Sequence, residues 1–198
     1  KFKIFFAKIT KALIRMPNYE GDKLLLNMLE HIDIFSDFIK DFSKLNIQEE
    51  RKFLFYLSLK QYDLANNLLA KNPILKTDFH KTIRKCFRDS IYWSEFFNWK
   101  FEYLRNISIY ISKLNNSDLS KINPTVIFLA YSLLKDEKKA INMLRNEGTY
   151  NGIGDKELPE AYNFVLKETK SFLKMFKKIK ELPNKPLFLY ELSELFFP

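Results

Sequence analysis

The stretch TDFHKTIRKCFRDSIYWSEFFNWKFEYLRNISIYISKL, residues 77–114, contains neither glycine nor proline. Because these two residues are the main breakers of helices, an uninterrupted run of this length predicts one long helix, or two helices placed end to end. Phe79, Ile83 and Phe87 recur along it at the spacing of a helix face that packs on a core. The stretch therefore indicates an all-α protein with a long, aromatic-rich central helix.

The rest of the chain carries the same helical pattern. Only 4 of the 198 residues are glycine, and prolines or polar clusters separate the apolar segments. They predict further helices over about 2–16, 22–45, 46–60, 63–71, 124–134, 136–145, 157–182 and 187–197. We expect an irregular bundle of antiparallel helical hairpins that forms one domain over 1–198, with a seam between two halves near 115–120.

A short pattern that predicts helix, tight turn, helix occurs twice. The sequence LSLK at 57–60 is followed by Ala65, and YSLLK at 131–135 is followed by Ala140. A small residue is needed where two helices cross closely, so the arrangement resembles tetratricopeptide-like or ankyrin-like hairpins. The spacing of about 75 residues differs from the ~33 to 34 of those repeats. The pattern therefore supports helical hairpins but assigns no family.

The composition argues against most kinds of catalytic site. A single cysteine, Cys86, excludes an internal disulfide and a cysteine-ligated metal cluster, and His31 and His80 are the only histidines. No G-x-S-x-G nucleophile motif is present, and the glycine-containing loop at 146–155 lacks the G-K-[ST] ending of a P-loop. We predict a protein that is not an enzyme and that needs no metal or cofactor.

The net charge of +9, from 33 basic and 24 acidic residues, would attract an anionic partner. Two basic helix faces are the candidate sites, and the alternative for each is an ordinary solvated face. The first lies on the central segment and contains Lys81, Arg84, Lys85 and Arg88. The second lies on the last long helix and contains Lys167, Lys170, Lys174, Lys177 and Lys178.

Aromatic residues supply a second kind of candidate contact. The run at 92–103 holds too many aromatic residues for one helical face, so some of them are expected at the surface unless the helix is surrounded on all sides. Exposed aromatic residues beside arginine are typical of binding hot spots and of membrane-interface anchors. The candidates are Trp93, Phe96, Phe97, Trp99 and, in the glycine-containing loop, Tyr150.

These features lead to two functional hypotheses. The first is a non-enzymatic module that binds a protein partner, of the bacterial effector, immunity or regulatory-subunit kind. The alternative is a helical domain that docks on anionic membranes through phosphoinositides or other acidic headgroups. Nucleic acid ranks third as a partner, because no nucleic-acid-binding signature accompanies the charge. We expect a soluble protein of the bacterial cytoplasm or one delivered into a host cell, with peripheral membrane contact under the alternative.

Overall fold

The computed structural model describes residues 47–96 and 101–146, together with residues 159, 162, 163, 165, 167 and 178. Every regular element within these residues is a helix, which confirms the all-α prediction. The elements are α4 (Glu49–Ser58), α5 (Tyr62–Lys71), α6 (Pro73–Thr77), α7 (Phe79–Phe96), α8 (Phe101–Ser112), α9 (Asn116–Leu119), α10 (Pro124–Leu133) and α11 (Glu137–Asn146). None of the described helices combines the length and the apolar character needed to cross a membrane.

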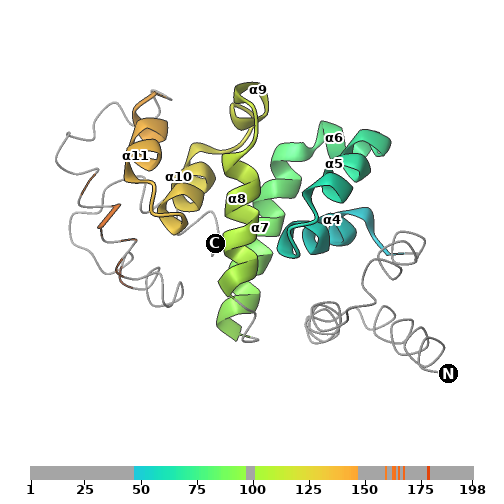
Figure 1. Cartoon of the computed structure of the whole chain (residues 1–198), viewed down its shortest axis with the longest axis horizontal. Coiled ribbons are helices and arrows are strands. Elements are labelled where there is room, and N and C mark those ends of the chain that lie inside the picture. Colours follow the sequence, from blue (N-terminus) through green and yellow to red (C-terminus); the bar gives the residue numbers. More distant parts are fainter. Residues whose placement is uncertain are drawn as a thin grey trace.

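Helix α8 stands in the middle of the described part of the chain (Figure 1). The α4–α5 hairpin and α6 lie on one side of it, and the α10–α11 hairpin lies on the other. Helix α8 packs directly against α4, α7 and α10. It has completely buried residues along its length, including Leu104, Ile107 and Ile111.

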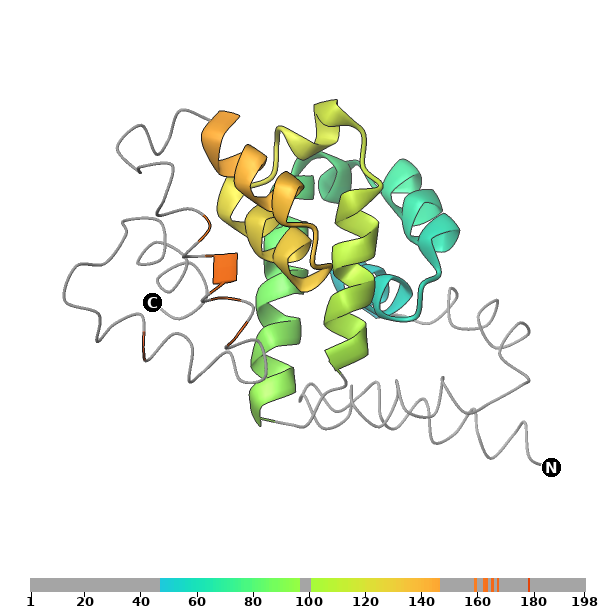
Figure 2. The ribbon, with the colours of Figure 1, turned by 60° about the vertical axis from the view of Figure 1, so that its left-hand side comes forward.

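The segment at 77–114 contains two separate helices that fold back on each other, so the predictions of one long central helix and of two helices placed end to end are both wrong. Helices α7 and α8 run side by side in opposite directions (Figure 2). Folding back buries the apolar faces of both helices, including Ile83, Phe87 and Ile91 of α7. Two helices in line would leave these faces without partners, so the hydrophobic effect favours the hairpin.

The α4–α5 and α10–α11 hairpins repeat one local structure at a spacing of about 75 residues. All four helices have 10 residues. Each first helix is followed by a lysine in the left-handed region, with φ of 60° at Lys60 and 62° at Lys135. The amide after each lysine donates back to a tyrosine carbonyl oxygen: Gln61 to Tyr56 at 2.8 Å and Asp136 to Tyr131 at 3.0 Å. This is a Schellman cap, with lysine where glycine is usual.

The small residue that the repeated pattern placed in each second helix is completely buried. Ala65 of α5 and Ala140 of α11 are both 0% exposed. Each lets its helix approach the preceding one, and α4–α5 and α10–α11 are in direct contact. The prediction of two helical hairpins, each with a tight turn and a small buried residue where its helices pack, is therefore confirmed.

One cluster of buried residues links all the larger described helices. It includes Phe53 of α4, Phe87 of α7, Phe128 of α10 and, from the C-terminal part, Tyr162 and Val165. The described residues within the predicted helix at 157–182 are helical. The predicted helices over 2–16, 22–45 and 187–197 lie outside the described residues, and the organisation of 1–198 as one domain stays a prediction.

Candidate binding cleft

A cleft of about 380 Å³ lies where α5, α6, α8 and α9 converge beside the start of α7. We call it the lysine cleft, because three lysines line it: Lys76, Lys113 and Lys121. Its other lining residues are Asn66, Leu69, Ala70, Phe79, Tyr110, Leu114, Asn115 and Asp118. The cleft therefore combines positive charge, amide groups and apolar surface.

A set of packed aromatic rings holds the α5 and α8 walls of the cleft together. The Tyr110 hydroxyl donates to Asn66 Oδ1 at 2.8 Å, and this bond joins α8 to α5. The Tyr110 ring lies edge-on to Phe53, with centroids 6.0 Å apart, and 5.6 Å from the ring of Tyr62. Burial, with a smaller contribution from Asp118, raises the pKa of Tyr110 above its ordinary value. The hydroxyl therefore stays a neutral hydrogen-bond donor.

The acidic residue of the cleft is already satisfied by its neighbours. Lys121 Nζ donates to Asp118 at 2.9 Å, and Asn115 Nδ2 donates to the same carboxylate at 3.0 Å. The backbone amide of Asp118 donates in turn to Asn115 Oδ1 at 2.9 Å. The hydrogen bond from Lys121 is the main reason that the pKa of Asp118 lies below its ordinary value, despite partial desolvation. Asp118 and Lys121 thus offset each other's charge, and the charge of Lys76 makes a smaller contribution to the low pKa of Asp118.

The other two lysines keep their charge available. Among the described residues, neither Lys76 nor Lys113 forms an ion pair. Lys113 Nζ lies 5.1 Å from the centroid of the Tyr62 ring, a cation–π contact that orients the side chain without neutralising it. Burial and nearby Glu102 raise the pKa of Tyr62 to about 12, so its ring is uncharged at neutral pH. The cleft has a net positive charge that can attract an anionic group.

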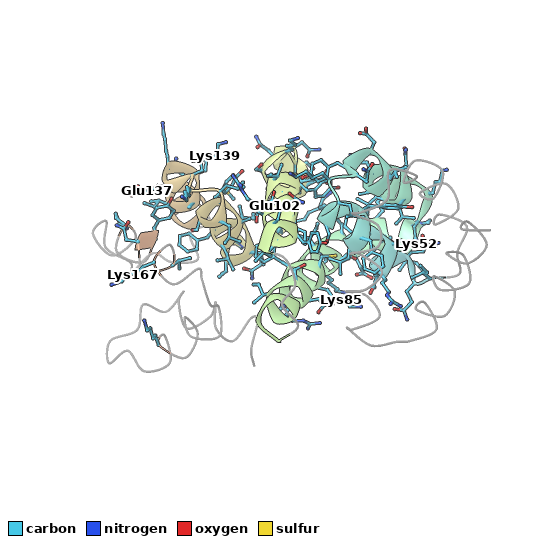
Figure 3. The ribbon with its side chains drawn as sticks, turned by 60° about the horizontal axis from the view of Figure 1, so that its bottom comes forward. Lys52, Lys85, Glu102, Glu137, Lys139 and Lys167 are labelled. Atoms are coloured by element: carbon cyan, nitrogen blue, oxygen red, sulfur yellow. The ribbon has the colours of Figure 1, made fainter. Side chains whose placement is uncertain are left out.

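The predicted basic face on α7 is exposed, but most of its cations are paired. Lys81 Nζ lies 2.9 Å from Asp78, Arg88 lies 3.2 Å from Asp89, and Lys85 bonds to Glu50 of α4. Arg84 is also exposed and makes interactions of its own. Lys85 projects from α7 in Figure 3, on the side of the molecule that also carries Lys52. An anionic partner at this face would have to displace the carboxylates that already pair with these basic residues. The face therefore carries less uncompensated positive charge than the sequence suggests.

Cys86 faces the interior beside a smaller cleft of about 140 Å³ between α4 and α7. Burial raises the pKa of its thiol well above the ordinary value, with Asp89 and Glu50 adding to the effect. Such a thiol is a poor nucleophile at neutral pH. The sequence interpretation of Cys86 as a buried, inert cysteine agrees with this environment. Among the described residues, no group of histidine, cysteine and carboxylate side chains could hold a metal ion.

The structure describes only some of the remaining predicted contact residues. Trp93 and Phe96 lie on the last turns of α7, while Phe97, Trp99 and Tyr150 fall outside the described residues. Lys167 and Lys178 are exposed helical residues, and Lys170, Lys174 and Lys177 also fall outside. Figure 3 places Lys167 on the α11 side, near Glu137 and Lys139. The structure does not bring Lys167 to the lysine cleft.

Sequence reasoning missed the lysine cleft. Its charged residues come from separate short segments, and only the polar run at 115–118 stood out, because it lies at the predicted seam near 115–120. Lys113 and Lys121 flank that run, which is the one local signal of a functional loop. No family model, no curated protein and no solved structure matches this chain.

Proposed function

We propose that the chain is a non-enzymatic helical binding module, of the effector, immunity or regulatory-subunit kind, that engages a protein partner at the end formed by α5, α6 and α9. The observation that supports it is the lysine cleft, which joins apolar lining to two lysines, Lys76 and Lys113, that form no ion pair among the described residues, in a volume of about 380 Å³. Sites that combine apolar surface with a few polar groups are where ligands and partner segments dock.

The helix that carries Lys76 also has an exposed apolar side chain, which is not among the residues that line the cleft. Ile74 is 73% exposed and lies on α6, the same short helix that carries Lys76. Asn72 fixes the position of α6, because its side chain accepts a hydrogen bond from the amide of Leu75 at 3.1 Å. A single exposed isoleucine is common on protein surfaces, and residues two apart point to different sides of a helix, so Ile74 offers apolar contact area outside the cleft that Lys76 lines. We propose that Ile74 packs against the partner.

A peptide selection tests this function and needs no purified partner. Random linear peptides displayed on phage are selected on the full chain, and the enriched peptides are synthesised and added to isotope-labelled protein. We expect amide resonances of α5, α6 and α9 to shift, while those of α11 stay unchanged. Ile74→Ala should weaken binding by about tenfold or more, as expected for an interface anchor. Shifts on α11, or no enriched peptide, would contradict the proposal.

Membrane docking is the second candidate function, and the surroundings of Ile74 support it. Lys71 and Lys76 are exposed and flank Ile74 in the sequence, and an exposed apolar side chain with lysines close by in the chain suits an anionic bilayer. Co-sedimentation with phosphatidylserine and phosphoinositide vesicles at about 0.1 M and 0.5 M salt tests it, because salt removes non-specific charge attraction. Binding that survives high salt would support this candidate, and binding that vanishes would reject it.

A further inference from the structure

We propose that the lysine cleft recognises an acidic segment of a protein partner, with Lys76 and Lys113 contacting its carboxylates. This inference rests on the proposed function and adds the chemistry of the ligand. The two lysines lie on different elements, on α6 and just after α8, and both line the same cleft. Their convergence comes from the tertiary fold, in contrast to the lysines along one helix face.

The environment of each lysine leaves it ready for an anionic group. Neither forms an ion pair among the residues that the structure describes, although the charge of Lys76 helps to lower the pKa of Asp118. By contrast, Lys81, Lys85 and Lys121 each pair directly with a carboxylate. Lys113 is held near the Tyr62 ring, so part of the entropy cost of ordering its side chain on binding is already met. The bond between the Tyr110 hydroxyl and Asn66 keeps the α5 and α8 walls in place.

The cleft suits a peptide better than a phosphate group. It offers lysines, which bind as point charges, and no arginine among its described lining residues to grip a phosphate in bidentate fashion. Asp118 repels any anion, but a dianionic phosphate more strongly than the single charge of a peptide carboxylate, and its carboxylate can also accept a hydrogen bond from a peptide amide. Leu69 and Leu114, which are only partly buried, supply apolar contact area that a peptide side chain can cover and a free phosphate cannot.

Two peptides of equal length and apolar content test the inference, one with glutamate and the other with glutamine at alternate positions. Isothermal titration calorimetry with the full chain measures both dissociation constants. We expect the glutamate peptide to bind about tenfold or more tightly than the glutamine peptide. Equal affinities would overturn the proposal for acidic ligands.

Two double variants with the same net charge distinguish the contribution of the cleft lysines to peptide binding from that of the overall charge. The double variant Lys76→Glu with Lys113→Glu should weaken binding of the glutamate peptide by about tenfold or more. Lys138→Glu with Lys167→Glu makes the same change in net charge at exposed positions outside the cleft, and should have an effect within about twofold. Equal losses in the two double variants would show attraction by overall charge and overturn the proposal.

Further outcomes distinguish this inference from the proposed function. If phage-selected peptides bind at the cleft but lack acidic residues, the binding module stands and the acidic specificity fails. If neither synthetic peptide binds and only the cleft double variant loses vesicle binding, the ligand is a lipid headgroup and both the acidic-peptide inference and the protein-partner function fail. Inorganic phosphate should compete with the glutamate peptide weakly, and competition at micromolar phosphate would also overturn the peptide assignment.

Discussion

The side-chain amide of Asn106 donates to the carbonyl oxygen of Ser58 at 2.7 Å. Ser58 is the last residue of α4, where helix carbonyls have no partner within the helix. From the start of α5, the Tyr62 hydroxyl donates to the Asn106 carbonyl oxygen at 2.9 Å. Asn106 is 4% exposed, so α8 supplies a buried cap for the turn of the α4–α5 hairpin.

Asn106→Ala should therefore destabilise the protein by about 1–3 kcal/mol, because it leaves the Ser58 carbonyl without its side-chain donor in a buried place. Ser108→Ala on the same helix is the control. Ser108 is also buried, but its hydroxyl bonds only to the Leu104 carbonyl at 3.0 Å within α8. We expect it to cost less than about 1 kcal/mol. Urea unfolding of both variants checks the difference, and equal losses would contradict the capping role of Asn106.

The left-handed lysines predict that glycine stabilises both hairpins. Lys135→Gly should raise the free energy of unfolding by about 1 kcal/mol, because glycine removes the steric strain of a positive φ. Lys60→Gly should raise the free energy of unfolding by less, because it also removes the ion pair of Lys60 with Glu102 at 3.3 Å. Exposed ion pairs contribute about 0–1 kcal/mol.

Lys138→Gly is the matched control for these two variants. Lys138 is exposed and lies in the first turn of α11 with ordinary helical geometry, where glycine should cost up to about 1 kcal/mol and bring no gain. Thermal unfolding of the three variants measures the differences. A loss of stability in Lys135→Gly would show that the left-handed residue is not strained.

The close helix crossings predict that Ala65 and Ala140 tolerate no larger side chain. Ala65→Leu and Ala140→Leu should each destabilise by about 1–3 kcal/mol, because the added atoms must force α4 from α5, or α10 from α11. Ala70→Leu on α5 is the control, since Ala70 is exposed and has room. Guanidinium unfolding of the three variants tests this, and a neutral Ala140→Leu would mean that α11 can shift away from α10.

The sequence predicted most of the described helices because each one is encoded locally, but it missed the short helices α6 and α9, the second of which lies at the predicted seam. Asn72 and Pro73 separate α5 from α6, and Asn123 with Pro124 starts α10, as the local residues require. The same holds for the two alanine crossings, where a small residue in an apolar pattern is a direct signal. The apolar face of Phe79, Ile83 and Phe87 was likewise identified from its spacing and is buried.

The tertiary relationships could not be predicted in the same way. Nothing in the local sequence of 97–100 distinguishes two helices in line from two that fold back, because that choice depends on which faces they bury together. The lysine cleft depends on the same packing, since Lys76 and Lys113 meet only after α6 and α8 are in place. The same limit applies to the basic face on α7. Helical spacing placed Lys85 on this face, but it could not show that Glu50 of α4 pairs with it.

Two carboxylates whose pKa values shift in opposite directions give the last prediction. Burial raises the pKa of Asp89 despite the hydrogen bond from Arg88 and the charge of Lys85, and Glu50 adds to the rise. A carboxyl whose folded-state pKa is raised destabilises the fold progressively as pH rises from the unfolded-state pKa through the folded-state pKa. Asp89→Asn should therefore raise the melting temperature at about pH 7, and this gain should disappear near pH ~2.5, where the carboxyl is protonated in both states.

The pKa of Asp78 is shifted in the opposite direction, so this residue serves as the control. The hydrogen bond from Lys81 holds the pKa of Asp78 below its ordinary value. Its contribution to stability is present above the unfolded-state pKa and is lost as pH falls through the folded-state pKa. Asp78→Asn should slightly lower the melting temperature at about pH 7, and this loss should shrink with acidification. If both variants change stability in the same direction at neutral pH, burial is not the dominant influence on Asp89, and the cleft between α4 and α7 is wetter than its lining residues indicate.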